Sequence, residues 1–174
     1  MTTIICGTNR KNSNSAIVGG IYQQMMKDVG HTANLVNLQH LPDDFIKSAL
    51  YEVAGTNEHF NPVRELMAQS DKFVFIVPEY NGSFPGVLKT FIDGLKFPGT
   101  FTGKKSALVG ISSGIQGGVL AMSHLTDILN YCGTNVLAQK PKLSGIEKNL
   151  KDGKITNPLY VQLLEEQIRA FVAY

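Results

Sequence analysis

The segment from Phe73 to Asp93 constrains the fold of this chain more than any other. It begins with the uninterrupted apolar run FVFIV at residues 73–77, which is typical of a strand buried on both faces of a parallel sheet. The turn-rich stretch PEYNGSFPG follows at residues 78–86, and the amphipathic pattern after it predicts a helix that begins at Pro85. In an open α/β sheet, a loop between the carboxyl end of such a strand and a helix belongs to the ligand crevice. The segment therefore predicts an α/β fold and a binding loop together.

The remainder of the chain alternates between strand and helix patterns. Strands are expected at residues 3–6, 33–38, 72–77, 105–111 and 135–139. Helices are expected at residues 15–29, 61–69, 85–95, 118–131 and from residue 157 onward. Residues 41–60 fit neither pattern well and are expected to hold little more than a helical turn.

Two local features of these helices are specific enough to be tested against the structure. The first helix carries Ile17, Ile21 and Met25 on one side, which we expect to face the sheet. The second helix begins with Asn61-Pro62, so the Asn61 side chain is expected to cap its first turn.

Strands separated by helices imply a parallel sheet with right-handed crossovers. We expect an α/β fold, namely a flavodoxin-like three-layer sandwich whose five-stranded parallel sheet has the order 2-1-3-4-5. A length of 174 residues, 43% of them hydrophobic, suits a single domain over residues 1–174. In this order the ligand crevice lies between strands 1 and 3. The three most unusual loops, at residues 7–14, 78–84 and 112–118, would meet there.

Composition excludes several classes of function. A formal net charge of +2 is too small for a strongly basic surface that binds nucleic acid. No apolar run approaches the roughly 20 residues of a membrane span, and the N-terminus lacks the pattern of a secretory signal. We therefore expect a cytoplasmic protein without nucleic-acid or membrane partners. Cys6 and Cys132 lack the spacing of metal ligands or of a disulfide framework, so neither a metal site nor a disulfide is expected.

The first loop has the composition of a phosphate site. Between Gly7 and Ser15 it offers several hydroxyl groups, backbone N–H groups and the guanidinium of Arg10 at the start of a helix. The glycine patterns of dinucleotide and nucleoside-triphosphate loops are both absent, so a single phosphate, as in a mononucleotide, is favoured. The alternative is a solvated loop with an ordinary Ser or Asn helix cap.

The second and third loops suit a flat ligand. Around Tyr80, the second loop combines an aromatic ring with small residues whose backbone can approach a planar group closely. The third loop, at residues 112–118, is rich in serine and glycine and leaves backbone N–H groups free. For the third loop alone, a simple connector remains the alternative.

Taken together, these motifs resemble the NADPH-dependent FMN reductase family. The second loop carries the resemblance through the pattern PEYNGSxPGxLK at residues 78–89, which Ile92-Asp93 follows. The first loop matches as Gly7-Thr8-x-Arg10-x-x-Ser13, and the third matches through Ser113-Gly114 and Gly117-Gly118. The motifs extend from residue 7 to about residue 118. One departure is Gly94, which stands where members of the family often have Trp.

The resemblance implies that FMN is bound noncovalently. Carried over by position, the residues that would hold its 5′-phosphate are Thr8, Arg10, Ser13, Asn14 and Ser15, although Ser15 stands where the family often has Asn. The residues that would line the isoalloxazine ring are Pro78, Glu79, Tyr80, Asn81 and Gly82. The residues that would flank its other edge are Ser112, Ser113 and Gly114.

The resemblance also implies an FMN-dependent NAD(P)H oxidoreductase. Hydride would pass from NAD(P)H as co-substrate through bound FMN to a small acceptor such as a flavin, a quinone, an azo compound or a metal oxyanion. The flavin carries the chemistry, so no catalytic side chain is expected. Glu79 could be solvated or catalytic, and Tyr80 could face the flavin or pack in a subunit interface. A homodimer or homotetramer is implied by the resemblance alone.

Two other functions are compatible with the same fold. A flavodoxin-type electron-transfer protein without NAD(P)H reductase activity would stabilise a one-electron-reduced flavin. Such carriers are usually strongly acidic, whereas this chain is mildly basic. A regulatory domain that has lost its flavin would be colourless, and the intact first and second loops argue against it.

Overall fold

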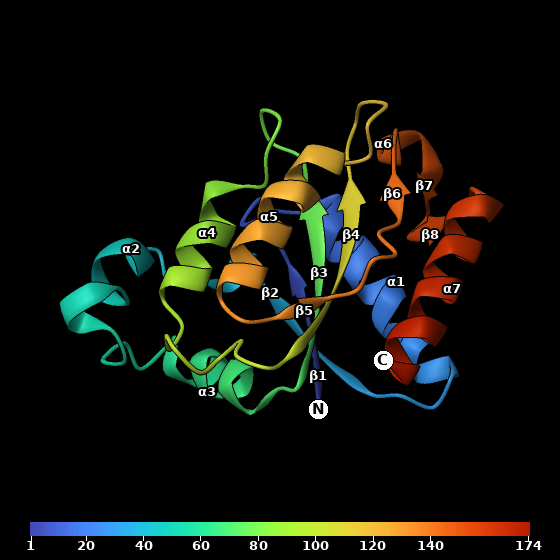
Figure 1. Cartoon of the computed structure of the whole chain (residues 1–174). Helices are drawn as coiled ribbons and strands as arrows, with labels where there is room; N and C mark the ends of the chain where they lie inside the picture. Colours follow the sequence, from blue (N-terminus) through green and yellow to red (C-terminus); the bar gives the residue numbers. More distant parts are fainter.

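The computed structural model describes all residues, 1–174, and contains the predicted parallel sheet. Its strands β1 to β5 run over Thr2–Cys6, Ala33–Asn37, Lys72–Pro78, Lys105–Ile111 and Asn135–Val136. They pair in parallel in the order β2-β1-β3-β4-β5, which confirms the predicted order (Figure 1). The expected strand boundaries hold to within about a residue for β1 to β4.

The far edge of the sheet differs from the prediction. The expected strand at 135–139 pairs with β4 only over its first two residues, and β6 (Lys142–Leu143) then pairs with the other end of β4. The sheet therefore has six strands rather than five. In the gap between β5 and β6, the buried Gln167 amide donates to the Leu108 and Gln139 carbonyls, each at 2.9 Å. A side chain thus replaces the missing strand-to-strand hydrogen bonds.

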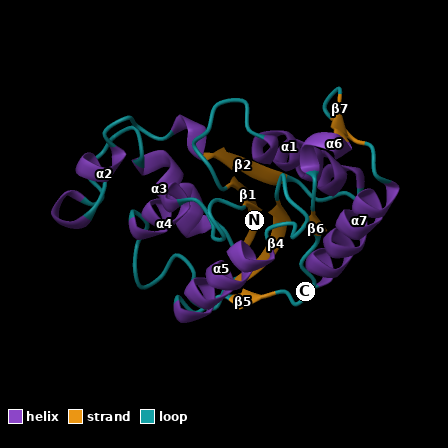
Figure 2. Cartoon of the chain, turned by 90° about the horizontal axis from the view of Figure 1, so that it is seen from above, coloured by secondary structure: helices purple, strands orange, loops and turns teal.

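Helices cover both faces of the sheet and make the predicted three layers (Figure 2). Helices α1 and α7 lie on one face, over Asn14–Asp28 and Pro158–Ala173. Helices α3, α4 and α5 lie on the other face, over Asn61–Gln69, Gly86–Asp93 and Val119–Tyr131. Alternate residues of β3 enter opposite cores: Phe73 and Phe75 pack towards α4 and α5, whereas Val74 and Ile76 pack towards α1 and α7. None of the helices is long and apolar enough to cross a membrane.

The buried side of α1 was predicted only in part. Val18, Tyr22 and Met26 face the sheet, whereas Ile17 is exposed and Met25 is partly buried against the same core. Gly19 explains the difference, because a Cβ atom there would lie 2.5 Å from the Cys6 sulfur. With Gly19 facing the sheet, α1 can approach the sheet closely. The side of the helix that contains Gly19 is less apolar than the side with Ile17 and Ile21, so hydrophobicity alone did not identify it.

The Asn61 cap was also predicted incorrectly. The N-cap of α3 is Phe60, and the Asn61 side chain instead donates to the Gly55 carbonyl at 2.9 Å. Residues 38–60 form short elements: the 3-10 helix η1 (Leu38–His40), helix α2 (Phe45–Ser48) and the 3-10 helix η2 (Tyr51–Val53).

A small unit after β6 was not expected from the sequence. It consists of helix α6 (Ile146–Asn149) and an antiparallel hairpin of β7 (Leu150–Lys151) and β8 (Lys154–Ile155). Leu150 and Ile155 pack against the core that α1 and α7 cover. The unit therefore forms part of the wall at the end of the sheet to which β3 and β4 point (Figure 1).

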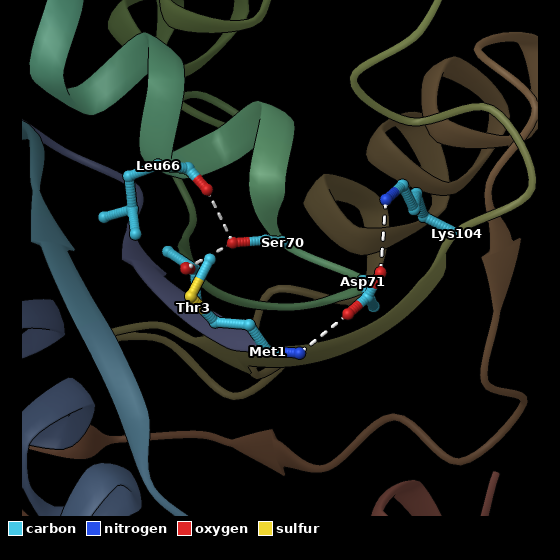
Figure 3. Close-up of polar contacts among 6 residues, drawn as sticks. All are labelled: Met1, Thr3, Leu66, Ser70, Asp71 and Lys104. Atoms are coloured by element: carbon cyan, nitrogen blue, oxygen red, sulfur yellow. Dashed lines mark hydrogen bonds and ion pairs between the residues drawn. The ribbon is translucent and has the colours of Figure 1, made fainter.

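The opposite end of the sheet is closed by polar contacts, which Figure 3 shows. The N-terminal ammonium lies 2.7 Å from one carboxylate oxygen of Asp71, and Lys104 lies 3.3 Å from the other. Thr3 and Ser70 share a buried hydrogen bond of 2.7 Å. These contacts join the amino ends of β1 and β3, whereas the loops at the carboxyl ends carry unpaired polar groups.

Candidate functional site

The three predicted loops meet around a hollow of about 340 Å³ at the carboxyl ends of β1, β3 and β4. Its lining comprises Thr8, Arg10, Lys11, Asn12, Ser13, Asn14, Ser15, Pro78, Glu79, Tyr80, Ile111, Ser112, Ser113, Ile146 and Glu147. Most of the site residues predicted from the sequence are in this set. Asn81, Gly82 and Gly114 are not.

The start of α1 has the features of an anion site. Ser13 is its N-cap, and the Ser13 hydroxyl accepts a hydrogen bond from the Ala16 N–H at 3.2 Å. The N–H groups of the residues just before and at the helix start, from Lys11 to Ser15, have no acceptor in the protein. These free donors and the helix dipole favour a negative charge at this point.

Ser15 strengthens this assignment. Its side chain is 1% exposed, and its hydroxyl oxygen has no hydrogen-bond partner in the protein. A buried polar atom without a partner is costly, so a ligand atom in the hollow is the natural partner. The residue whose match to the family pattern was imperfect is therefore the one with an unused donor.

Positive charge surrounds the same point. Arg10 and Lys11 are exposed at the rim, and neither has a carboxylate within ion-pair distance. Two acidic residues, Glu79 and Glu147, also line the hollow, and the Glu147 carboxylate accepts a hydrogen bond from the Ser113 hydroxyl at 3.0 Å. The two cations belong to the same loop as the free N–H groups before α1, whereas the two carboxylates belong to other segments.

Tyr80 connects the first two loops. Its hydroxyl shares a hydrogen bond of 2.9 Å with the hydroxyl of Thr8, a residue that is fully buried. The Thr8 oxygen also accepts from the Arg10 N–H at 3.3 Å. One threonine therefore fixes both the backbone of the first loop (residues 7–14, here called the phosphate loop) and the aromatic ring of the second loop.

The second loop is a tight hairpin. Tyr80 and Ser83 form an antiparallel bridge, and Asn81 and Gly82 between them have φ angles of 52° and 76°. This is the geometry that favours Asn-Gly in two-residue turns. Close approach to a ligand was the reason expected for Gly82, but a Cβ atom there would meet nothing within 4 Å. Turn geometry alone therefore explains the Asn-Gly pair in this structure.

The third loop is folded around Ser112. The Ser112 hydroxyl donates to the Gly114 carbonyl at 2.8 Å and accepts from the Gly117 N–H at 2.9 Å. The Ser112 carbonyl in turn accepts from the Ile146 N–H, which joins this loop to α6. The Ser112 side chain thus shapes the loop, while the N–H groups of Ser113 and Gly114 have no acceptor in the protein.

Several lining residues were missed by sequence reasoning. Lys11 and Asn12 lie within the first loop and could have been included with their neighbours. Ile146 and Glu147 come from α6, a helix of four residues that no periodic pattern announces. Only the three-dimensional fold brings α6 to the hollow.

A second cavity, of about 660 Å³, lies on the other side of Tyr80. It is lined by Asn9, Lys11, Leu38, Gln39, Leu41, Pro42, Asp43, Phe45, Ile46, Tyr80, Pro85, Gly86, Val87 and Thr90. Tyr80 and Lys11 line both spaces, so the tyrosine forms a wall between them. Residues 38–46, which the sequence left unassigned, thus build one side of a cavity next to the hollow.

Comparison with known proteins identifies the family. The sequence model described as NADPH-dependent FMN reductase matches residues 2–145. The chain belongs to this family. An NAD(P)H-dependent FMN reductase of Pseudomonas aeruginosa is 32% identical to it over 111 residues, which are 62% of this chain and 60% of the relative. A quinone reductase of Escherichia coli is 33% identical over 112 residues, with the same coverage. The chain thus spans about 60% of the length of these curated relatives.

Solved structures share the fold of this member of the FMN reductase family. The flavoenzyme NAD(P)H:acceptor oxidoreductase FerB of Paracoccus denitrificans superposes with a TM-score of 0.77 at 24% identity, covering 99% of this chain and 95% of its own. The flavodoxin of Megasphaera elsdenii superposes with a TM-score of 0.61 at 15% identity, covering 97% and 99%. Both confirm the flavodoxin-like architecture.

The hollow fits the phosphate of the flavin that the family name implies. A phosphate monoester needs several hydrogen-bond donors and a positive field. The free N–H groups of α1, the Ser15 hydroxyl and the cations of Arg10 and Lys11 supply both. The particular contacts that the sequence assigned to each residue stay predictions.

Proposed function

We propose that this protein is an FMN-dependent NAD(P)H oxidoreductase that reduces a small acceptor such as a flavin, a quinone, an azo compound or a metal oxyanion. The observation that carries the proposal is the buried Ser15 hydroxyl, which has no partner and lies among free N–H groups at the start of α1. The names of the matched relatives, an NAD(P)H-dependent FMN reductase and a quinone reductase, support the same class of reaction.

The protein residues would bind and orient the cofactor in this proposal. The N–H groups of α1, with Ser15 and Arg10, would hold the 5′-phosphate. The Glu79 N–H donates to the Ile111 carbonyl at 3.0 Å, so the start of the second loop is fixed to the end of β4. The isoalloxazine ring of the flavin would therefore rest against rigid backbone. Bound FMN would supply the two-electron chemistry for the two hydride transfers, from NAD(P)H and to the acceptor. No side chain need move a proton for the first of these transfers.

Spectroscopy tests this proposal directly. The purified protein would be incubated with FMN, gel-filtered and then treated anaerobically with NADPH or NADH. We expect retained yellow colour that bleaches in one two-electron step. Retained colour that neither nucleotide bleaches would contradict the reductase and favour a one-electron carrier, and a colourless protein would contradict both.

Arg10 offers a second test of the same site. Arg10→Ala removes a charged donor at the rim, so we expect FMN to bind about tenfold more weakly or worse. Lys27→Ala serves as the matched control, because it also removes one exposed cation but does not line the hollow, and it should leave FMN affinity unchanged. Equal FMN affinity in Arg10→Ala and the wild type would remove Arg10 from the phosphate site.

We further propose that the protein forms a homodimer, or a homotetramer built from such dimers. An apolar groove of about 490 Å³ runs between α4 and α5. At its end, Phe97 and Tyr131 stack with nearly parallel rings although they are 67% and 82% exposed. Of the charged residues that line the groove, Lys89 and Asp93 pair with each other, whereas Lys96 and Asp127 have no ion-pair partner within the chain, so two copies of the groove could pair these two charges. Sedimentation velocity of Tyr131→Glu, which should be monomeric, tests the interface.

A further inference from the structure

The positive charge of this chain is concentrated in one short segment, here called the lysine lobe, at residues 140–154. Its charged residues are Lys140, Lys142, Glu147, Lys148, Lys151, Asp152 and Lys154. Five lysines against two acidic residues give the lobe a formal charge of +3, whereas the whole chain carries +2. None of the five lysines lies within ion-pair distance of a carboxylate.

The hairpin in the lobe brings two of these charges together. Lys151 and Lys154 are direct cross-strand partners in the β7–β8 pair. Their neighbours Leu150 and Ile155 pack against the core, so the two lysines point to the opposite, solvent side. Cross-strand Cβ atoms lie only about 5 Å apart, and like charges there are destabilising. An anion with two negative charges between the two ammonium groups would remove that repulsion.

The lobe begins at the wall of the hollow. Ile146 and Glu147 line it, and Lys151 follows Glu147 by four residues, which cannot span more than about 14 Å. Helix α6 lies at the end of the molecule to which β3 and β4 point, and the hairpin follows it along the side of the molecule (Figure 1). A ligand that extends out of the hollow across α6 would therefore reach the hairpin.

We propose that Lys151 and Lys154, with Lys148 beside them, bind the adenosine 2′-phosphate of NADPH, and thereby make the enzyme prefer NADPH to NADH. The inference rests on the proposed function. The anion in question is a phosphate monoester with about two negative charges, which two adjacent ammonium groups match. FMN carries such a group too, but the start of α1 already provides its site. The remaining phosphate monoester in the reaction is the one that distinguishes NADPH from NADH.

A pair of double variants tests the proposal. Lys151→Gln/Lys154→Gln removes the facing charges, and Lys27→Gln/Lys47→Gln removes two exposed, unpaired lysines elsewhere. Both variants have the same net charge. With the FMN-loaded enzymes, we expect kcat/KM for NADPH to fall about five- to tenfold in the first variant and kcat/KM for NADH to change less than about twofold. The difference should shrink at high salt.

A binding measurement separates this inference from the reductase proposal. Adenosine 2′,5′-bisphosphate and adenosine 5′-monophosphate would be titrated into each protein by calorimetry. The wild type and the Lys27/Lys47 variant should favour the bisphosphate, and the Lys151/Lys154 variant should lose that preference. If this holds but no nucleotide bleaches the flavin, the phosphate site stands and the reductase fails.

Three outcomes would overturn the inference. Equal losses with NADPH and NADH would mean that the lobe attracts anions without reading the 2′-phosphate. Equal losses in both double variants would mean that only net charge matters. A wild type that binds both adenosine phosphates equally would leave the hairpin without a ligand of this class.

Discussion

The hydrogen bond between Tyr80 and Thr8 makes a sharp prediction about how the site is held together. It joins the hairpin of the second loop to the phosphate loop, and no other side-chain hydrogen bond joins these two loops directly. Tyr80→Phe deletes the hydroxyl and keeps the ring that separates the two cavities. We therefore expect the variant to fold normally, with a less firmly held phosphate loop.

The size of the effect follows from burial. A neutral hydrogen bond contributes about 0.5–1.5 kcal/mol, and a buried group left without a partner costs about 1–3 kcal/mol. Thr8 is fully buried, but its oxygen still accepts from the Arg10 N–H in the variant. The loss in the free energy of unfolding should therefore be intermediate, at about 1–2 kcal/mol. FMN affinity should fall as well, because the phosphate loop must then be ordered during binding.

A double-mutant cycle provides the assay. Tyr80→Phe, Thr8→Val and the double variant would be unfolded with urea, with Tyr51→Phe as the control for an exposed tyrosine that has no hydrogen bond. We expect a coupling energy of about 1 kcal/mol between the two sites. Coupling within about 0.3 kcal/mol of zero, or an equal effect of Tyr51→Phe, would refute the reasoning that this bond joins the loops.

Three further changes are predicted to have distinct signatures. Ser15→Ala removes a buried hydroxyl that has no partner, so apo stability should stay equal or rise, while calorimetry should show FMN bound about tenfold more weakly. Gln167→Leu strands the Tyr22 hydroxyl and two carbonyls, so urea unfolding should show a loss of about 3 kcal/mol or more, unlike Gln162→Leu on the exposed side. The N-terminal ammonium and Lys104 lower the pKa of Asp71, so its stabilisation is present above the unfolded pKa and disappears as pH falls through the folded pKa. Asp71→Asn should therefore flatten the stability profile below about pH 4, as thermal melts would show.

The sheet order could be predicted because each signal was local. The buried runs of β3 and β4 are unbroken, and the helices between them have clear ends, so handedness and layering leave few topologies. The split of the last strand into β5 and β6 could not be predicted in this way. It depends on Gln167, which lies 28 residues beyond Gln139 in sequence and replaces the missing hydrogen bonds from a helix.

The site was predictable where its residues belong to the chain's own loops. Thr8 and Tyr80 lie just after the ends of strands, Ser13 caps the helix that follows the first of them, and parallel strands bring their carboxyl ends together. Glu147 and the lysine lobe were not predictable, because β6 carries them back to the hollow after a turn with no periodic pattern. Residues at the ends of predicted strands can be placed at the site from the sequence, whereas residues on a short segment such as β6 and α6 cannot.

For Gly82 and Ser15, the structure gives different reasons for the residue than the sequence did. Gly82 was expected to leave space for a ligand, yet space is plentiful there and a positive φ explains the glycine. Ser15 was the weakest match among the phosphate residues, yet its buried hydroxyl is the one without a partner. A turn residue is satisfied by the fold alone, whereas an unsatisfied buried donor requires something that the chain does not contain. The unsatisfied Ser15 hydroxyl is therefore stronger support for a phosphate-bearing cofactor than the sequence motif of the loop that contains it.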